Sequence, residues 1–73
     1  MSNEFEYLKI TTTKGVIVQE LKFRRDLEVA NWHYYENTSG KLVHIRKEHM
    51  VSVEELLEGD FEIELERLES EYE

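Results

Sequence analysis

The sequence predicts one small, mainly β domain: a barrel of about five strands that ends in a short acidic strand or helix. Its 73 residues, 40% of them hydrophobic, suffice for a single core, because chains of this size bury only about 60% of their unfolded surface. Two segments rich in Thr, Val, Ile and aromatic residues each contain a central group of turn formers, as β-hairpins do. We therefore expect a single domain over residues 1–73, with an acidic C-terminal segment at 54–73.

Residues 5–23 predict the first hairpin, with a two-residue turn at Lys14-Gly15. This turn would place Leu8 opposite Leu21, an apolar cross-strand pair. One face of the hairpin would then contribute to the core through Leu8, Ile10, Ile17, Leu21 and Phe23. The next segment, 24–30, lacks alternation and predicts a connection or a single helical turn.

A second hairpin is expected from residues 31–36 and 41–46, joined by the turn formers at 37–40. Pairing Glu36 with Lys41 would direct Trp32, Tyr34, Val43 and Ile45 to one face, which we interpret as core together with Phe23. The opposite face would carry His33, Tyr35, Leu42, His44 and Arg46. A slip of one residue would exchange the two faces, so this assignment depends on the loop length.

The rest of the chain leaves alternatives open. Residues 47–49 predict a tight turn and 50–53 a strand, although Ser52 with Glu55 also matches a capping box for a short helix. We favour the strand. The final segment fits a strand through the alternation of Phe61, Ile63 and Leu65, and a helix through the spacing of Leu65, Leu68 and Tyr72.

The stretch 42–53 has the order strand, tight turn, strand, and it resembles the closing segment of Sm-like and SH3-like small barrels. This resemblance implies a barrel fold. In the Sm-like family a Lys-His pair in that segment contributes to an RNA pocket, and Arg46, Lys47 and His49 lie in the comparable place here.

Charge is unevenly distributed along the chain. Residues 1–53 hold seven acidic and eight basic residues, a net charge of +1, whereas 54–73 hold ten acidic residues against Arg67, a net of −9. A body that is nearly neutral can bind a ligand with one or two phosphates. Long nucleic acids are disfavoured, because their affinity depends on neutralising many phosphates at once.

Composition excludes several classes of protein. The chain has no cysteine, so disulfides and thiolate zinc sites are excluded, and it has no Gly-x-Ser-x-Gly or phosphate-binding glycine loop. We expect no enzyme, no cofactor and no metal. A soluble cytoplasmic protein is predicted, since no apolar run approaches the roughly 18 residues of a membrane span. A small core also favours a homo-oligomer, a dimer or tetramer.

The strongest candidate site is the face that would combine His33, Tyr35, His44 and Arg46, with Lys47 beside it. Aromatic rings can stack on a base, and a guanidinium can grip a phosphate. Lys22, Arg24 and Arg25 form a second basic candidate. An ordinary solvated sheet face is the alternative interpretation for both groups.

In its small size, acidity and lack of cysteine, the chain is similar to small β proteins of bacteriophages. Some of these are counter-defence proteins, called anti-CBASS or anti-Thoeris sponges, that sequester cyclic-nucleotide immune signals. This similarity implies a ligand such as a cyclic dinucleotide, held at a subunit interface in the host cytoplasm. The alternative is an acidic interaction module or inhibitor that docks on a basic host protein. RNA binding in the Sm-like manner ranks last, because the charge of the chain opposes it.

Overall fold

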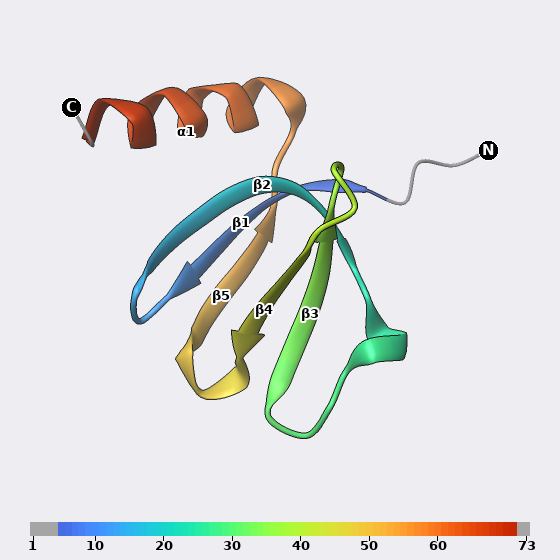
Figure 1. Ribbon diagram of the computed structural model, residues 1–73. Helices are drawn as coiled ribbons and strands as arrows, with labels where there is room; N and C mark the ends of the chain where they lie inside the picture. The colour runs from blue at the N-terminus through green and yellow to red at the C-terminus, as the bar shows by residue number, and fades with distance from the viewer. Residues whose placement is uncertain (1–4, 72–73) are drawn as a thin grey trace.

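The computed structural model describes residues 5–71 and contains one antiparallel five-stranded sheet followed by one helix (Figure 1). Its elements are β1 (Glu6–Thr12), β2 (Gly15–Phe23), the 3₁₀ turn η1 (Arg25–Leu27), β3 (Trp32–Asn37), β4 (Leu42–Arg46), the 3₁₀ turn η2 (Lys47–His49), β5 (Met50–Glu55) and α1 (Glu58–Glu71). The mainly β class, the helical turn after the first hairpin and the strand at 50–53 are confirmed.

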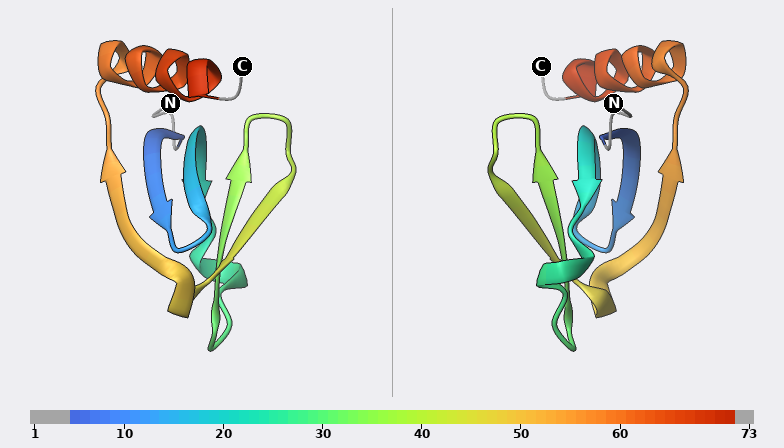
Figure 2. Two further views of the ribbon diagram at one scale, coloured as in Figure 1. Left: turned by 90° about the vertical axis from the view of Figure 1, so that its left-hand side faces the viewer. Right: turned by 90° about the vertical axis from the view of Figure 1, so that its right-hand side faces the viewer.

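The order of strands in the sheet is β4-β3-β2-β1-β5, so the two edge strands are consecutive in the chain and joined only by η2. In a flat sheet four strand spacings would separate these edges by about 19 Å. The four residue steps from Arg46 to Met50 reach at most about 14 Å. The sheet therefore curls, and Figure 2 shows β4 and β5 apart near α1 and converging at η2. No pairing between β4 and β5 occurs within the described part.

The concave side of the curled sheet holds the core. Its buried members are Leu8, Ile10, Leu21, Tyr35 and Ile45, with Ile17, Val43 and Met50 packed against them. The predicted core face of the first hairpin is confirmed except at its end, where Phe23 remains 38% exposed.

The register of the first hairpin differs from the prediction by two residues. Leu8 lies opposite Gln19, and the turn is Thr13-Lys14, followed by Gly15 at φ 143°. A shift of two residues preserves the side to which each residue points, because side chains alternate with a period of two. The core face was therefore predicted correctly from a wrong register.

The register of the second hairpin differs by one residue, and here the prediction of faces was wrong for β3 and correct for β4. Asn37 pairs with Lys41 through a backbone hydrogen bond of 2.9 Å, which leaves a loop of three residues in place of four. The Asn37 Oδ1 atom accepts hydrogen bonds from the N–H groups of Ser39 and Lys41, and Gly40 takes φ 82°. A glycine with positive φ at the end of such a loop is typical of three-residue hairpins.

This one-residue difference exchanges the faces of β3, whereas β4 keeps its predicted faces, with Val43 and Ile45 toward the core. Tyr35 opposes Val43 on the core side, where Tyr35 is only 5% exposed. Trp32 and Tyr34, expected in the core, lie instead on the outer face with Arg46 and His44 opposite them.

The C-terminal segment, left open between strand and helix, forms α1. The residues of α1 that turn toward the sheet are Phe61, Glu64, Leu65 and Leu68, at helical spacing. The Phe61 ring lies 4.5 Å from that of Tyr7, and Glu64 pairs with Lys9 at 3.4 Å, so α1 covers the outer face of β1. Ile63, which a strand would bury, is 63% exposed. Tyr72 lies outside the described residues.

Within residues 5–71, no helix combines the length and the apolar character that crossing a bilayer requires.

The loop of the second hairpin gives a test of the register. Gly40→Ala should lower the free energy of unfolding by about 1–2 kcal/mol, because an alanine pays a steric penalty at positive φ. The matched control, Gly59→Ala in α1, should leave stability unchanged or raise it by up to about 1 kcal/mol. Urea unfolding followed by circular dichroism measures both. A Gly40→Ala variant as stable as the parent would contradict the loop geometry.

Candidate ligand-binding site

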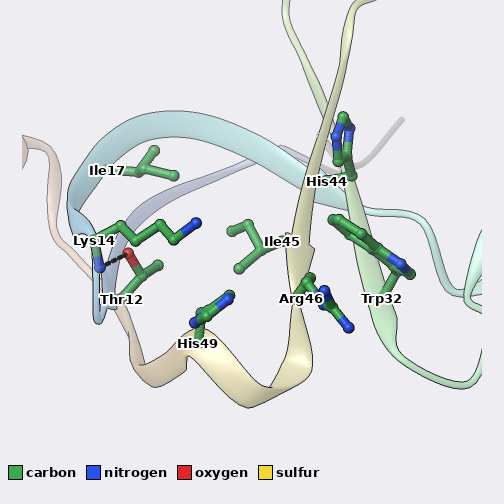
Figure 3. A pocket seen from close by; sticks show the side chains of 8 residues that line it. All are labelled: Thr12, Lys14, Ile17, Trp32, His44, Ile45, Arg46 and His49. Atoms are coloured by element: carbon green, nitrogen blue, oxygen red, sulfur yellow. Dashed lines mark hydrogen bonds between the residues drawn. The ribbon is translucent and has the colours of Figure 1, made fainter.

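An open cavity of about 250 Å³ lies where the β1–β2 turn faces the end of the β3–β4 hairpin and η2 (Figure 3). It is lined by Thr12, Lys14, Ile17, Trp32, His44, Ile45, Arg46 and His49. The curl of the sheet creates this cavity, because it brings three segments far apart in the sequence to one place.

One wall of the cavity is an aromatic and cationic group on the outer face of β3 and β4. Trp32 lies directly opposite Arg46, whose guanidinium carbon is 5.6 Å from the centroid of the indole ring. The His44 ring meets Trp32 at 5.1 Å and 63°, in an edge-on arrangement, and its centroid is 6.2 Å from that of Tyr34. A cation within about 6 Å of an indole ring is attracted by the ring's negative face.

The opposite wall is the β1–β2 turn, which carries Lys14. The Thr12 hydroxyl accepts a hydrogen bond from the Lys14 N–H at 3.1 Å and donates one to the Gly15 carbonyl at 2.8 Å. These bonds fix the turn, and the Lys14 side chain extends across the cavity (Figure 3). Among residues 5–71, no carboxylate pairs with Lys14. Its charge is therefore available to an anionic ligand.

The third wall is η2, and it is fastened to the β1–β2 turn. The Thr13 N–H donates to the His49 carbonyl at 2.8 Å, and the Thr13 hydroxyl lies 2.9 Å from His49 Nδ1. Beside the cavity, Glu48 Oε1 lies 3.0 Å from Arg46 Nε and 3.8 Å from His49 Nε2. This wall therefore combines an imidazole and a guanidinium around one carboxylate.

Only part of the predicted binding face comes together. His44 and Arg46 line the cavity, but His33 and Tyr35 belong to the other side of the sheet. Tyr35 is buried, which raises the pKa of its phenol, and the negative charge of Glu28 acts in the same direction. His33 Nδ1 lies 3.3 Å from Glu28 Oε1. The predicted group of His33, Tyr35, His44 and Arg46 was wrong because the loop is one residue shorter than assumed.

Arg24, a member of the second predicted basic group, is held by carboxylates. Its guanidinium contacts Glu36 at 2.6 Å and Asp26 at 2.7 Å. These hydrogen bonds raise the pKa of Arg24, and the same contact lowers the pKa of Asp26. The neighbouring Arg25 is exposed in η1 and does not line the cavity. Neither arginine is therefore well placed for the ligand.

Lys47 is likewise engaged. Its Nζ atom lies 2.7 Å from Glu28 Oε1, and this hydrogen bond lowers the pKa of the Glu28 carboxyl group. Lys47 lines a separate cavity of about 190 Å³ with Asn31, Arg46 and Glu48. Of the predicted cations, Arg46 alone reaches the larger cavity.

Sequence reasoning missed two residues of the site, Trp32 and Lys14. Trp32 was assigned to the core because of the assumed register, and Lys14 was considered only as a turn residue. A signal was present for Trp32, because Asn at the first position and Gly at the fourth position of a turn are typical of a three-residue hairpin loop that ends in a glycine bulge. That reading would have given the three-residue loop and the correct face.

The described part of the chain has no group of three or more His, Asp or Glu side chains placed to hold a metal ion. Chemically, the cavity offers an indole surface, two imidazole rings and two cationic side chains. Such a set suits a planar ring that carries negative charge. No family model, curated protein or solved structure was found to match this chain significantly.

The pair of Lys47 and Glu28 can be tested by titration. In Lys47→Met the pKa of Glu28 should rise toward its ordinary value, because the carboxylate loses its hydrogen-bond donor. Carbon-13 NMR of the glutamate carboxyl groups measures it, with Lys41→Met as the control of equal charge.

The lowered pKa of Glu28 determines how the stability of the fold changes with pH. The pair stabilises the fold at neutral pH, and this contribution is lost as pH falls below about 4.5, where Glu28 becomes protonated in the unfolded chain and then in the fold. The stability difference between the parent and Lys47→Met should therefore shrink in acid. A Glu28 pKa that is the same in both proteins would contradict the pairing.

Proposed function

We propose that this chain is a non-enzymatic binding protein that sequesters a small nucleotide in the cavity beside the β1–β2 turn. The base would stack on Trp32, and a phosphate would lie between Lys14 and Arg46. The observation that carries this proposal is the meeting in one cavity of an indole ring, a guanidinium 5.6 Å from its centroid and a lysine that no carboxylate of residues 5–71 pairs. Stacking on an aromatic ring contributes about 1–3 kcal/mol per base, and charge-assisted hydrogen bonds hold phosphates.

The size of the cavity supports a ligand shared between subunits. Sites for drug-sized ligands have volumes of about 300–1,000 Å³, and this cavity, at about 250 Å³, has room for one base and its phosphate. A cyclic dinucleotide has two of each. Two copies related by a two-fold axis would supply two identical cavities to such a ligand. We therefore propose a homo-oligomer that encloses a cyclic dinucleotide-like signal, as a phage-type sponge does in the host cytoplasm.

We also propose that the curled sheet is a small barrel of the SH3-like or Sm-like kind. Support comes from the order β4-β3-β2-β1-β5 and from the three-residue η2 that joins the two edge strands. A barrel of this size is filled by its own side chains. A ligand must then bind at the edge of the core, where the cavity opens beside Ile17 and Ile45.

A second candidate function is an acidic module that binds a basic host protein. It is favoured by the outward side of α1, where Ile63 is 63% exposed among glutamates and Leu57, just before the helix, is 76% exposed. Apolar side chains surrounded by charge of one sign are typical of protein contact sites.

The nucleotide proposal can be tested through Trp32, the only tryptophan of the chain. Mononucleotides and cyclic dinucleotides that bind should quench its fluorescence, because a stacked base lies against the indole, and calorimetry should give matching affinities. Lys14→Met and Arg46→Met should each weaken binding roughly 10- to 150-fold, the cost of one hydrogen bond to a charged group.

Lys41→Met is the matched control, because Lys41 lies at the β3–β4 loop, outside the cavity. It should bind as the parent does. Absence of both heat and quenching across the panel at micromolar protein would contradict the nucleotide proposal, as would equal losses in all three variants.

The protein-binding alternative makes a different prediction. Ile63→Asp should abolish capture of a basic partner and leave nucleotide quenching unchanged, because Ile63 belongs to α1 and does not line the cavity. Pull-down from host lysate compares it with Ile63→Val, which keeps an apolar side chain. Equal capture by both variants would exclude this helix face as the contact.

A further inference from the structure

We propose that Glu48 is an internal competitor for Arg46 and His49, which it holds at the rim of the cavity in the free protein. This inference rests on the function proposed above and names how that site is regulated. It starts from one atom, Glu48 Oε1, which lies 3.0 Å from Arg46 Nε and 3.8 Å from His49 Nε2. Both of these partners line the cavity, whereas Glu48 itself does not. The position of this carboxylate oxygen shows where Arg46 and His49 can attract an anion at the rim of the cavity.

The backbone holds this arrangement in place. Arg46 is the residue before η2, and Glu48 and His49 belong to it. The turn is tied at its start by the hydrogen bond from Lys47 N–H to the Asn31 carbonyl, 2.9 Å, and at its end by the bond from Thr13 N–H to the His49 carbonyl, 2.8 Å. The backbone thus keeps Arg46 and His49 beside the cavity, and an anion that replaces the Glu48 carboxylate requires only the glutamate side chain to move.

The exposure of the pair makes this replacement easy. The Arg46 and Glu48 side chains are 47% and 62% exposed, whereas those of Arg24 and Glu36 are 27% and 25% exposed. Exposed ion pairs contribute little to stability, because water already solvates both charges. The pair of Arg24 and Glu36 is a fixed part of the fold by comparison, and the pair of Arg46 and Glu48 can open without loss of the fold.

The consequence is selection for phosphorylated ligands. A phosphate carries more negative charge than a carboxylate and offers more acceptor oxygens, so it can displace Glu48 from Arg46. A neutral nucleoside can stack on Trp32 but gains nothing from that exchange. Glu48 is therefore a specificity-determining residue, and its removal should strengthen binding of phosphate without changing binding of the nucleoside.

The experiment compares the parent with Glu48→Gln and Glu48→Ala, using inorganic phosphate as the first probe. Nitrogen-15 NMR follows the Arg46 side-chain Nε–H and the His49 ring during titration. Both variants should bind phosphate roughly two- to fivefold more tightly, which corresponds to removal of one surface ion pair. The control is Glu66→Gln, an exposed glutamate of α1, which changes the net charge equally and should leave phosphate affinity unchanged.

The second pair of probes is 5′-AMP and adenosine, followed by Trp32 fluorescence. Glu48→Gln should tighten binding of 5′-AMP by the same factor and leave adenosine unchanged. An equal gain for both ligands would overturn the inference, because it would point to a general opening of the cavity. Thermal unfolding checks that each variant remains folded.

These measurements distinguish a failure of the nucleotide proposal from a failure of the proposed role of Glu48. If no nucleotide or nucleoside binds but phosphate binding is tighter in the Glu48 variants, the nucleotide function is overturned and the role of Glu48 stands. If phosphate affinity is the same in the parent and the Glu48 variants, or absent in all of them, the role of Glu48 is overturned whatever the nucleotides do. Equal tightening by Glu66→Gln would also overturn it.

Discussion

The three-residue connection between the two edge strands is the constraint on which the rest of this structure depends. Because η2 is too short to cross a flat five-stranded sheet, the sheet has to curl, and the curl creates both the concave core and the meeting of η2 with the β1–β2 turn. The register of β1 against β5 shifts between Thr11 and Thr12, where the two strands bend into this turn. Met50 then packs against the core at the first position of β5.

The same constraint determines which charges a ligand can reach. Arg24 and Lys47 lie beside carboxylates of β3 and of the segment before it, and they are paired there. Lys14 lies at the tip of the β1–β2 turn, which the curl aims at the cavity. The excess of acidic residues is carried by α1, above the other end of the sheet (Figure 1). The chain as a whole is acidic, yet its cavity is cationic.

The sequence was sufficient for the class of fold and for one of the two hairpin faces. Alternation of apolar residues identified Leu8, Ile10 and Leu21 as core, and a two-residue error in register did not matter because it preserves alternation. A curled sheet was expected only from the resemblance of residues 42–53 to small barrels, because the curl depends on the pairing of β1 with β5, a contact between distant segments. The form of the C-terminal segment stayed open for a related reason: its spacing fits both a strand and a helix, and the contacts with Tyr7 and Lys9 on β1 belong to the helix.

The candidate site was harder to predict than the core, because the number of residues in the β3–β4 loop decides which side chains of β3 face the cavity. Both faces of the β3–β4 hairpin carry aromatic and imidazole side chains, so hydrophobic patterning alone does not choose between them. The choice is made by Asn37, whose side chain closes the loop, and by Gly40, which accepts the positive φ that a three-residue loop needs. With four loop residues, Tyr35 would face outward and Trp32 would fill the core. Two residues of a turn therefore decide which aromatic ring lines the cavity, although neither of them lines it.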